Sequence, residues 1–433
     1  MVKLIINSRL KFFLASLVFF AIYEFIFFYK LVQVFNVEHV VWIQVYMVLT
    51  TLFLLSRPIM TLFYKDDHKE HFALIEGDKN LPKVSFIIAA KNEEDSIFRT
   101  IKTCIDSDYK GKMECVVVDD GSTDKTLEEM NRAAKELGTT RKKIKVIHFE
   151  INQGKREGMY EGVKHSNGDI FVFVDSDSFL KPNAVSHIVG HFLKDPKLGA
   201  VSGNTMVENR ETFLAKMQSA RYAISFDIFK ACESVFGAVT CCPGCFSAYR
   251  ADVVLSVIED WKNRQFFGSK ATFGDDRSLT NFVLDTGWKV SYCRGAEATT
   301  VVPDNYKKFI KQQLRWKKSW IREGFFGAAK FMWKQHPIAS TSFYINLIIP
   351  IIGPFIVVSG LLLKIAGGEW QNVLFFVVSV SVLSFAYGLF TYSLTRQKDF
   401  IYAVPFTIFY SFFLVWQMPW AILKIKDTSW GTR

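Results

Sequence analysis

The chain has 433 residues, of which 50% are hydrophobic, 15% aromatic and 22% charged, and it carries a net charge of +11. This composition excludes an intrinsically disordered chain, which is poor in hydrophobic residues, and the length excludes a small disulfide-stabilised scaffold. So many apolar residues beside so many charges indicate that membrane stretches alternate with water-soluble stretches, in two or three domains.

The N-terminal end of the chain is strongly apolar. The stretches 11–32 and 40–63 are each long enough to cross a bilayer, which needs about 20 residues. We expect Arg57, near the end of the second stretch, to extend its long side chain to the membrane surface. A cleaved signal peptide is the alternative for the first stretch, but the apolar run is too long and no small-residue cleavage site follows. Residues 1–63 are therefore predicted to form two transmembrane helices.

The distribution of basic residues predicts the orientation. Lys3, Arg9 and Lys11 precede the first span, whereas the link 33–39 contains no Lys or Arg. The positive-inside rule then places the N-terminus and the middle region, roughly 64–336, in the cytoplasm. The sequence therefore predicts a multi-pass protein of the plasma (inner) membrane with a cytoplasmic domain.

The cytoplasmic region is predicted to be α/β. Short β-branched runs alternate with amphipathic stretches such as 94–107 and 124–137. The runs are 83–89, 114–118, 144–149 and 170–174. This alternation favours βαβ units and a mostly parallel sheet, in which ligands bind at the carboxyl ends of the strands.

Acidic residues follow three of these runs. Glu93 and Glu94 follow the first run, Asp119 and Asp120 follow the second, and Asp175 and Asp177 follow the fourth. Two carboxylates two residues apart can share Mg²⁺ or Mn²⁺, and these hard cations also bind the oxygens of a diphosphate. A lone Asp-x-Asp is a weak signal, since solvated loops often carry such residues.

Three further segments are candidates for the same site. The glycine-rich stretch 152–158 could bring Lys155 and Arg156 to an anionic nucleotide, although it matches neither a P-loop nor a dinucleotide-binding fingerprint. Asp275 and Asp276 form a second carboxylate pair, which could supply a general base. The segment 312–316 sets an arginine, suited to a diphosphate, beside a tryptophan, suited to stacking on a sugar.

All seven cysteines fall in the cytoplasmic region, and an odd number in a reducing compartment predicts free thiols. Cys241, Cys242 and Cys245 could suggest zinc. No histidine or second cysteine pair stands near them in the sequence, so we favour a buried turn.

The C-terminal part returns to the membrane. Residues 317–334 mix basic residues with Trp, Phe and Met, as in an interfacial helix, with a helix packed in the core as the alternative. Three apolar stretches follow: 342–364, 371–394 and 400–422. Three spans would leave the C-terminus outside, whereas its basic residues favour the inside. One stretch is therefore re-entrant or interfacial, or holds two passes.

Taken together, these motifs resemble the membrane-integrated, processive family 2 glycosyltransferases, which comprise hyaluronan, chitin and cellulose synthases. The motifs, in the family's order, are VVDDGSTD (117–124), DSD (175–177), GDD (274–276) and QQLRW (312–316). The resemblance covers about residues 80–330 and implies a cytoplasmic GT-A domain, a Rossmann-like α/β fold, flanked by transmembrane helices. Its implied divisions are 1–63 (two helices), 64–316 (catalytic domain), 317–336 (interfacial helix) and 337–433 (helices and a gating tail).

The resemblance also implies an inverting displacement on a UDP-sugar and a role for each motif. Asp276 would be the base, Asp275 and Gln312 would support it, Arg315 would steady the departing UDP, and Trp316 would stack on the acceptor sugar. For the donor, the implied contacts are Asp119, Asp120, Lys155, Arg277, Trp430 and Arg433. Asp175 and Asp177 would hold Mg²⁺ or Mn²⁺, and Cys242, Pro243, Gly244 and Cys245 would lie near the acceptor entrance. The expected partners are UDP-sugars, a growing polysaccharide and the lipid bilayer, without nucleic acid.

The resemblance leaves the product open. GKREGMY (154–160) and SWGTR (429–433) resemble hyaluronan synthases, whereas FGAVTCCPGC (236–245) and ATTVVPD (298–304) resemble chitin-type enzymes. We favour hyaluronan, made from UDP-GlcNAc and UDP-GlcUA, over chitin or chitin oligosaccharide. A non-processive transferase acting on polyprenyl phosphate would not need Gln312–Trp316. A transporter or receptor would leave the acidic motifs unexplained.

Overall fold

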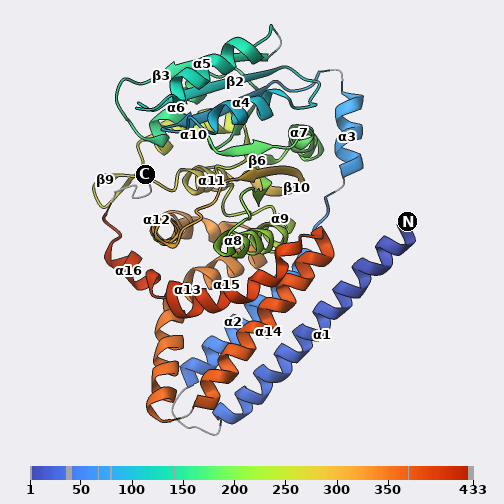
Figure 1. The fold of residues 1–433 in the computed structure, drawn as a ribbon, viewed down its shortest axis with the longest axis vertical. Helices are drawn as coiled ribbons and strands as arrows, with labels where there is room; N and C mark the ends of the chain where they lie inside the picture. Colours follow the sequence, from blue (N-terminus) through green and yellow to red (C-terminus); the bar gives the residue numbers. More distant parts are fainter. Residues whose placement is uncertain are drawn as a thin grey trace.

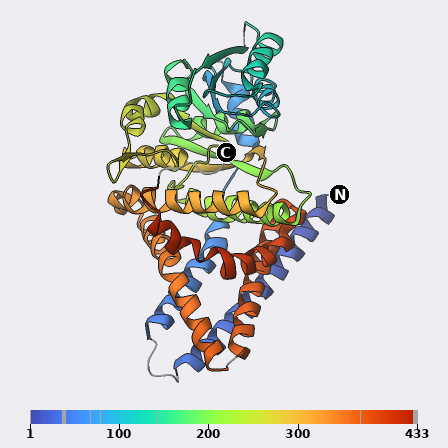
Figure 2. The same ribbon diagram turned by 60° about the vertical axis from the view of Figure 1, so that its left-hand side comes forward.

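The structure, a computed structural model, describes residues 2–35, 41–66, 68–78, 80–140, 142–368 and 370–427. A sheet domain stands at one end of the molecule and a bundle of long helices at the other, with further helices lying crosswise between them (Figures 1 and 2). The chain therefore separates into the two kinds of part that its composition predicts.

An eight-stranded mixed sheet forms the centre of the upper domain, in the order β3-β2-β1-β4-β7-β6-β10-β5. The strands are β1 (Val84–Ala90), β2 (Met113–Asp119), β3 (Lys142–His148), β4 (Ile170–Phe173), β5 (Ser178–Leu180), β6 (Leu198–Val207), β7 (Ser247–Arg250) and β10 (Lys289–Thr300). A separate hairpin pairs β8 (Gln265–Phe266) with β9 (Ser269–Lys270). Strands β3, β2, β1 and β4 run parallel, while β7 is antiparallel to both of its neighbours.

The four sequence-predicted strands are β1 to β4, and the α/β prediction is confirmed. In β1, Phe86 and Ile88 face one core cluster and Ile87 faces the other, because alternate side chains point to opposite faces of a sheet. A strand buried on both faces has a continuous apolar run, as this one does. The carboxyl ends of β1, β2 and β4 meet at one edge, where the acidic motifs lie.

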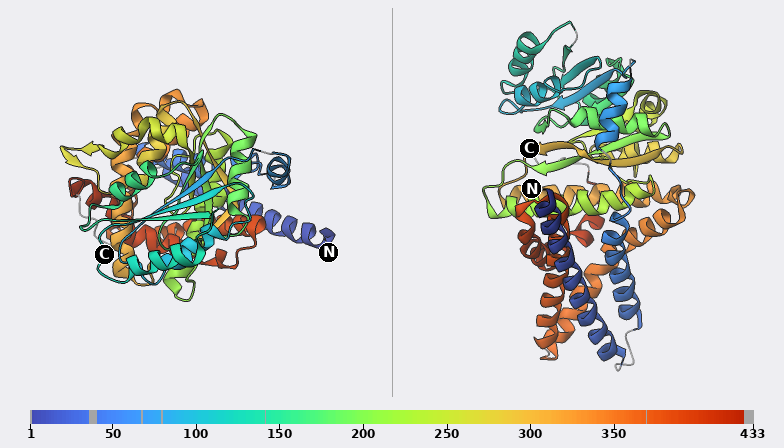
Figure 3. Two further views of the ribbon diagram at one scale, coloured as in Figure 1. Left: turned by 90° about the horizontal axis from the view of Figure 1, so that it is seen from above. Right: turned by 90° about the vertical axis from the view of Figure 1, so that its right-hand side faces the viewer.

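Helices cover both faces of the sheet. The helices of this domain are α3 (His68–Gly77), α4 (Ile97–Ile105), α5 (Thr126–Leu137), α6 (Lys155–Lys164), α7 (Ala184–Lys194), α10 (Ala251–Lys262) and α11 (Asp275–Asp285). Residues of α4, α5 and α7 share one core cluster, and residues of α6, α10 and α11 share the other. Seen from above, the strands fan across the centre of the domain with helices around them (Figure 3).

The crosswise layer contains α8 (Phe213–Ile224), a π-helical segment (Ser225–Lys230), α9 (Ala231–Val235) and α12 (Tyr306–Phe325). Helix α12 lies between the sheet domain and the long helices (Figure 2). It continues without a break past residue 316, so the QQLRW motif and the basic stretch that follows it share one helix. Two short 3₁₀ turns, Ala328–Lys330 and Met332–Lys334, follow it.

The long helices are α1 (Val2–Phe35), α2 (Val41–Thr61), α13 (Pro337–Ala366) and α14 (Trp370–Thr395). Within the described residues, three helical segments are long and apolar enough to cross a membrane: Leu10–Phe27, Pro337–Ser359 and Trp370–Thr395. The apolar part of α2, Val45–Thr61, is shorter than these. Pro350 and Pro354 lie inside α13, which remains helical.

The last apolar stretch is bent rather than straight. It comprises a 3₁₀ turn (Lys398–Tyr402), α15 (Ala403–Phe409), a π-helical segment (Tyr410–Leu414) and α16 (Gln417–Leu423), with a bend of 44° between Leu414 and Gln417. It lies across the upper ends of the long helices (Figure 2). Beyond it, the Ile425 carbonyl accepts a hydrogen bond from Arg322 Nε on α12 at 2.9 Å. The described end of the chain thus lies beside α12, on the same side of the long helices as the sheet domain.

Candidate active site

The loop after β2 is held by its own aspartates. Asp119 is fully buried, and its Oδ2 lies 2.7 Å from His148 Nδ1. Asp120 accepts hydrogen bonds from the backbone N–H groups of Gln153, at 2.6 Å, and Gly154, at 2.9 Å. Burial raises the pKa of Asp120, although these two donors oppose the rise. Asp120 therefore fixes the glycine-rich loop that precedes α6 against the end of β2.

The residues after β4 form a compact charged group. Lys155, the first residue of α6, pairs with Asp175 Oδ1. Asp177 accepts a hydrogen bond from Thr300 Oγ1 at 3.4 Å. Burial, with the adjacent Asp175 carboxylate, raises the pKa of Asp177 to about 7. Burial alone would lower the pKa of Lys155, but Asp175, Asp276 and Asp275 outweigh it and raise that pKa.

Asp275 and Asp276 begin helix α11, where backbone N–H groups point toward negative charge. Gly274, just before them, has φ of +82°, a conformation that favours glycine. A Cβ on Gly274 would lie 2.2 Å from Ser319 Oγ, so this glycine also allows α11 to approach α12. The Asp276 carboxylate accepts a hydrogen bond from the Gly244 N–H at 3.3 Å and from the Cys241 thiol at 4.0 Å.

The arginine beside Lys155 has a different role from the one expected. Arg156 is 7% exposed, and its Nε lies 2.7 Å from Asp275 Oδ1. Its Nη1 donates to the Trp261 carbonyl at 2.8 Å. The expectation that Arg156 reaches a nucleotide is therefore wrong, because neighbouring residues of an α-helix point about 100° apart, so that Lys155 faces the site while Arg156 faces the core. Arg156 and Asp275 instead join α6 to α11.

Gly244 brings the two carboxylate pairs together. Its N–H binds Asp276, and a Cβ built on it would lie 2.8 Å from Asp175 Oδ1 and 3.2 Å from Lys155 Nζ. Real Cβ atoms essentially never come within 3.0 Å of another heavy atom, so any side chain here would displace Asp175. The turn at 241–245 is thus a spacer that sets the separation of the two acidic motifs.

Substituting Gly244 by alanine should lower the rate of any reaction that uses both acidic motifs by about 100-fold, since a misplacement of about 1 Å in an active site has that effect. The thermal unfolding temperature should stay close to that of the wild type. Gly77→Ala is the matched control, because a Cβ there meets no atom within 4 Å. Catalysis at the wild-type rate in Gly244→Ala would show that this spacing is not important.

Helix α12 presents the third part of the site. Gln312, Arg315 and Trp316 are three and four residues apart and therefore share one face of the helix. The Gln312 Oε1 accepts a hydrogen bond from the Gln313 amide at 3.4 Å. The Arg221 guanidinium on α8 lies 5.2 Å from the centre of the Trp316 ring, within reach of a cation–π interaction.

The carboxylates of the site lie close enough to Arg315 to affect its pKa. Burial lowers the pKa of Arg315, while Asp276, Asp175 and Asp275, in that order, oppose the change. An arginine remains protonated in either case. The guanidinium of Arg315 therefore lies near both acidic motifs. In the chain, some 40 residues separate Arg315 from Asp276, and some 140 separate it from Asp175.

Two residues of α8 were missed in the sequence analysis. Burial raises the pKa of Tyr222, and the nearby Cys245, Asp177 and Asp175 add to this, so Tyr222 lies in the neighbourhood of the DSD motif. Arg221 contacts Trp316, as described above. No motif marks α8, and its residues show little amphipathic periodicity, so the sequence offered no signal that pointed to it.

The remaining candidates lie at the edges of the site or away from it. Arg277 Nη1 donates to the Thr240 carbonyl at 3.5 Å. Burial raises the pKa of the Cys245 thiol, and Asp175 and Asp177 add to this. Cys242 is fully buried in the core, with its N–H donating to Thr280 Oγ1 at 2.9 Å, so its thiol does not reach the surface of the site. Trp430 and Arg433 lie outside the described residues.

The residues present fit a hard divalent cation. Asp175 and Asp177 offer carboxylate oxygens, the ligands that Mg²⁺ and Mn²⁺ prefer. The raised pKa of Asp177 shows that its anion is disfavoured by burial and by Asp175, and a cation would remove that disadvantage. All seven cysteines are free thiols, and the turn at 241–245 does not form a metal cluster among the described residues.

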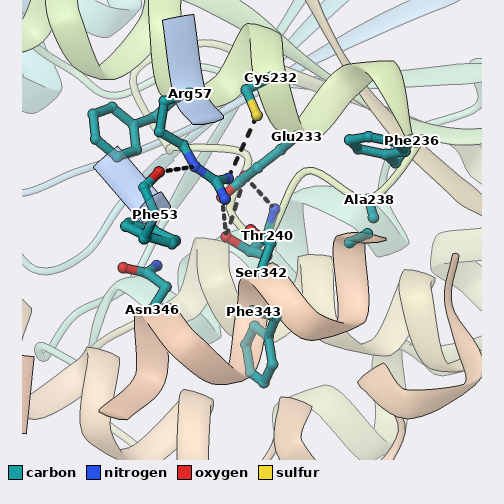
Figure 4. A pocket seen from close by; sticks show the side chains of 12 residues that line it. Phe53, Arg57, Cys232, Glu233, Phe236, Ala238, Thr240, Ser342, Phe343 and Asn346 are labelled. Atoms are coloured by element: carbon teal, nitrogen blue, oxygen red, sulfur yellow. Dashed lines mark hydrogen bonds between the residues drawn. The ribbon is translucent and has the colours of Figure 1, made fainter. Parts of the chain in front are cut away.

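A pocket adjoins the site on its membrane side (Figure 4). Arg57 of α2 points into it and is 6% exposed, with its Nη1 donating to Cys232 Sγ at 3.4 Å. The expectation that Arg57 reaches the membrane surface is therefore wrong. Thr240 lines the pocket and also accepts the hydrogen bond from Arg277, so the pocket and the site share this residue.

A known protein family matches the part of the chain that contains the loop after β2, the DSD motif and Gly244. The family described as Glycosyl transferase family 2 matches residues 85–257. The chain is 28% identical to hyaluronan synthase 2 of Bos taurus over 362 residues, which is 81% of this chain and 64% of that protein. It is 30% identical to hyaluronan synthase 3 of Homo sapiens over 287 residues, which is 64% of this chain and 50% of that protein.

A solved structure shares the fold. It is the mannosyltransferase PcManGT from Pyrobaculum calidifontis in complex with GDP-Man and Mn²⁺, with a TM-score of 0.59 and 18% identity, over 89% of this chain and 99% of that one. At this identity the likeness concerns the fold alone, and it confirms the expected GT-A class. The chain spans between half and just under two thirds of the length of the two curated relatives named above.

Proposed function

We propose that the chain is a member of the family 2 glycosyltransferases, whose model matches residues 85–257, and that it is a processive, inverting hexosyltransferase that builds hyaluronan from UDP-GlcNAc and UDP-GlcUA at the membrane. The observation that carries this proposal is the convergence of the DSD motif, the GDD motif and the Arg315–Trp316 face of α12 around Gly244. A transferase that adds one sugar to a lipid phosphate needs no such helix beside its acceptor site. The names of the relatives support hyaluronan as the polymer.

In this proposal the end of β2 and the DSD motif bind the donor. Asp120 and the loop at 153–154 would receive the uridine, and Lys155 would approach the diphosphate. Asp175 and Asp177 would hold Mg²⁺ or Mn²⁺. When bound, such a cation neutralises the charge of the diphosphate, as Mn²⁺ accompanies GDP-Man in the structurally similar mannosyltransferase.

Asp276 is the proposed general base. Its carboxylate would accept the proton of the acceptor hydroxyl while the hydroxyl oxygen forms a bond to the anomeric carbon and the bond to UDP breaks. This single displacement inverts the configuration and requires no nucleophilic side chain. The Gly244 N–H holds Asp276 Oδ2, and Arg315 would stabilise the negative charge on the departing UDP.

The acceptor would lie on the membrane side of this centre. Trp316, backed by Arg221, would stack on the terminal sugar. The pocket lined by residues of α2, α9 and α13 adjoins the site through Thr240 on this side. We further propose that the catalytic domain faces the cytoplasm and that the protein is a multi-pass protein of the plasma membrane.

A product assay tests the proposal. The full-length protein in detergent or lipid is incubated with Mn²⁺ or Mg²⁺ and with UDP-GlcNAc, UDP-GlcUA or both, and the product is sized before and after hyaluronidase digestion. We expect a hyaluronidase-sensitive polymer only when both donors are present. Polymer from UDP-GlcNAc alone would contradict hyaluronan and indicate a chitin-type product. Absence of polymer with every donor mixture would contradict processive synthesis.

A further inference from the structure

Four potential metal ligands meet away from the active-site carboxylates. Asp66, His71, His191 and Cys293 each offer one ligand atom, and these atoms all lie within 4.8 Å of one another. They come from four parts of the chain: the segment after α2, helix α3, helix α7 and strand β10. Helix α3 stands at the side of the sheet domain next to α7, above the point where the chain leaves the membrane helices (Figure 1). We refer to these four residues as the junction cluster.

The junction cluster is enclosed by the protein. The side chains of His71 and Asp66 are 1% and 3% exposed, and Cys293 is fully buried. His71 Nε2 lies 3.2 Å from His191 Nδ1, and His71 Nδ1 lies 3.6 Å from Asp66 Oδ1. Zinc bonds of about 2.0–2.3 Å in a tetrahedron place the ligand atoms about 3.3–3.8 Å apart. The four ligand atoms of the cluster lie within 4.8 Å of one another, so shifts of about 1 Å would bring them to this tetrahedral spacing.

Asp66 provides a second, independent observation. Its Oδ2 accepts a hydrogen bond from the Gly295 N–H at 2.9 Å, which fixes the carboxylate. Its Oδ1 is buried and accepts no hydrogen bond from any described residue, although it faces His71. A buried carboxylate oxygen that accepts no hydrogen bond destabilises the folded protein, whereas coordination to a cation would replace the missing hydrogen bond.

The backbone around His71 is packed to hold the cluster together. A Cβ on Gly190 of α7 would lie 2.7 Å from the Cβ of His71 and 2.8 Å from its Cα. Only a glycine at this position lets α3 approach α7 so closely.

We propose that the junction cluster binds one Zn²⁺ ion and that this ion fastens the segment leaving the membrane helix α2 to the catalytic domain. One sulfur donor, two imidazoles and one carboxylate form a set that favours zinc over the hard cations suited to Asp175 and Asp177. Four protein ligands leave no open position, so the ion would be structural. Binding of the ion by Cys293 would release the thiol proton to solvent.

The first test measures metal in the full-length protein. The protein is purified in detergent without chelators, and its zinc content is determined by mass spectrometry. We expect one zinc per chain in the wild type and almost none in Cys293→Ser and His191→Gln. The controls are Cys115→Ser, a fully buried cysteine outside the cluster, and His187→Gln, a buried neighbouring histidine. Asp177→Asn should also keep its zinc, which separates this ion from the cation proposed for the active site.

The second test uses only the wild type and so does not depend on how the variants fold. The protein is stripped with a zinc chelator, and Co²⁺ is titrated in. We expect one equivalent to produce the absorption bands of tetrahedral Co²⁺ with a thiolate ligand, and the stripped protein to unfold at a lower temperature until Zn²⁺ is restored. Absence of both zinc and the cobalt bands would overturn the proposal and leave a hydrogen-bonded polar cluster. Zinc retained in Cys293→Ser and His191→Gln would equally overturn it.

Discussion

Replacing Asp276 by asparagine is expected to lower the rate of sugar transfer by about 10²–10⁴-fold, the range that a general base contributes. Asparagine keeps the size of the side chain and still accepts the Gly244 N–H, which lies 3.3 Å from the carboxylate, but it cannot take a proton from the acceptor. UDP binding should remain at the wild-type level, because the proposed donor contacts come from β2, β4 and α6. Transfer rates and UDP titrations on the same preparation distinguish the two effects.

The control for this variant lies on the same helix. Asp285 ends α11, and its side chain is 52% exposed in an ion pair with Lys334. Asp285→Asn should change neither the rate of transfer nor UDP binding. If Asp276→Asn lost UDP binding and transfer to the same extent, Asp276 would be part of the donor site and not the base.

Replacing Asp177 by asparagine is expected to weaken cation-dependent UDP binding by at least about 100-fold, because changes to the outer shell of a metal site alone cost 10–100-fold. The amide removes one of the two carboxylates that would hold the cation. Titration of UDP with and without Mn²⁺ measures the effect. In the variant, Mn²⁺ should no longer improve binding, and UDP alone should bind as weakly as it does to the metal-free wild type.

Asp260→Asn serves as the comparison, since Asp260 is an exposed acid on α10. It should leave the response to Mn²⁺ unchanged. Wild-type enhancement by Mn²⁺ in Asp177→Asn would show that the cation binds elsewhere. The two predictions are independent, because the first concerns the acceptor proton and the second concerns the donor.

The parallel half of the fold could be predicted because its information is local. Each buried strand is a short apolar run, and the acidic residues follow the runs that became β2 and β4. Parallel strands place their carboxyl ends on one edge, so topology alone brings Asp120 and Asp175 together. The mixed half, with β5 to β7 and β10, was not predicted. Strands β7 and β5 are only four and three residues long, and β6 and β10 contain Gly, Ser and Thr that interrupt their apolar runs.

The sequence by itself determined the class of the domain, the residues that follow its strands, and the division between membrane and water, because these depend on periodicity, hydrophobicity and motif order. Only the tertiary structure decided how the motifs meet. Gly244 sets the spacing of Asp175 and Asp276, Arg156 turns to Asp275 instead of a nucleotide, and His71 reaches Cys293 across 222 positions. Such contacts follow from packing between elements distant in sequence, and a side chain's neighbours there depend on which helix face it occupies and how closely the backbones approach.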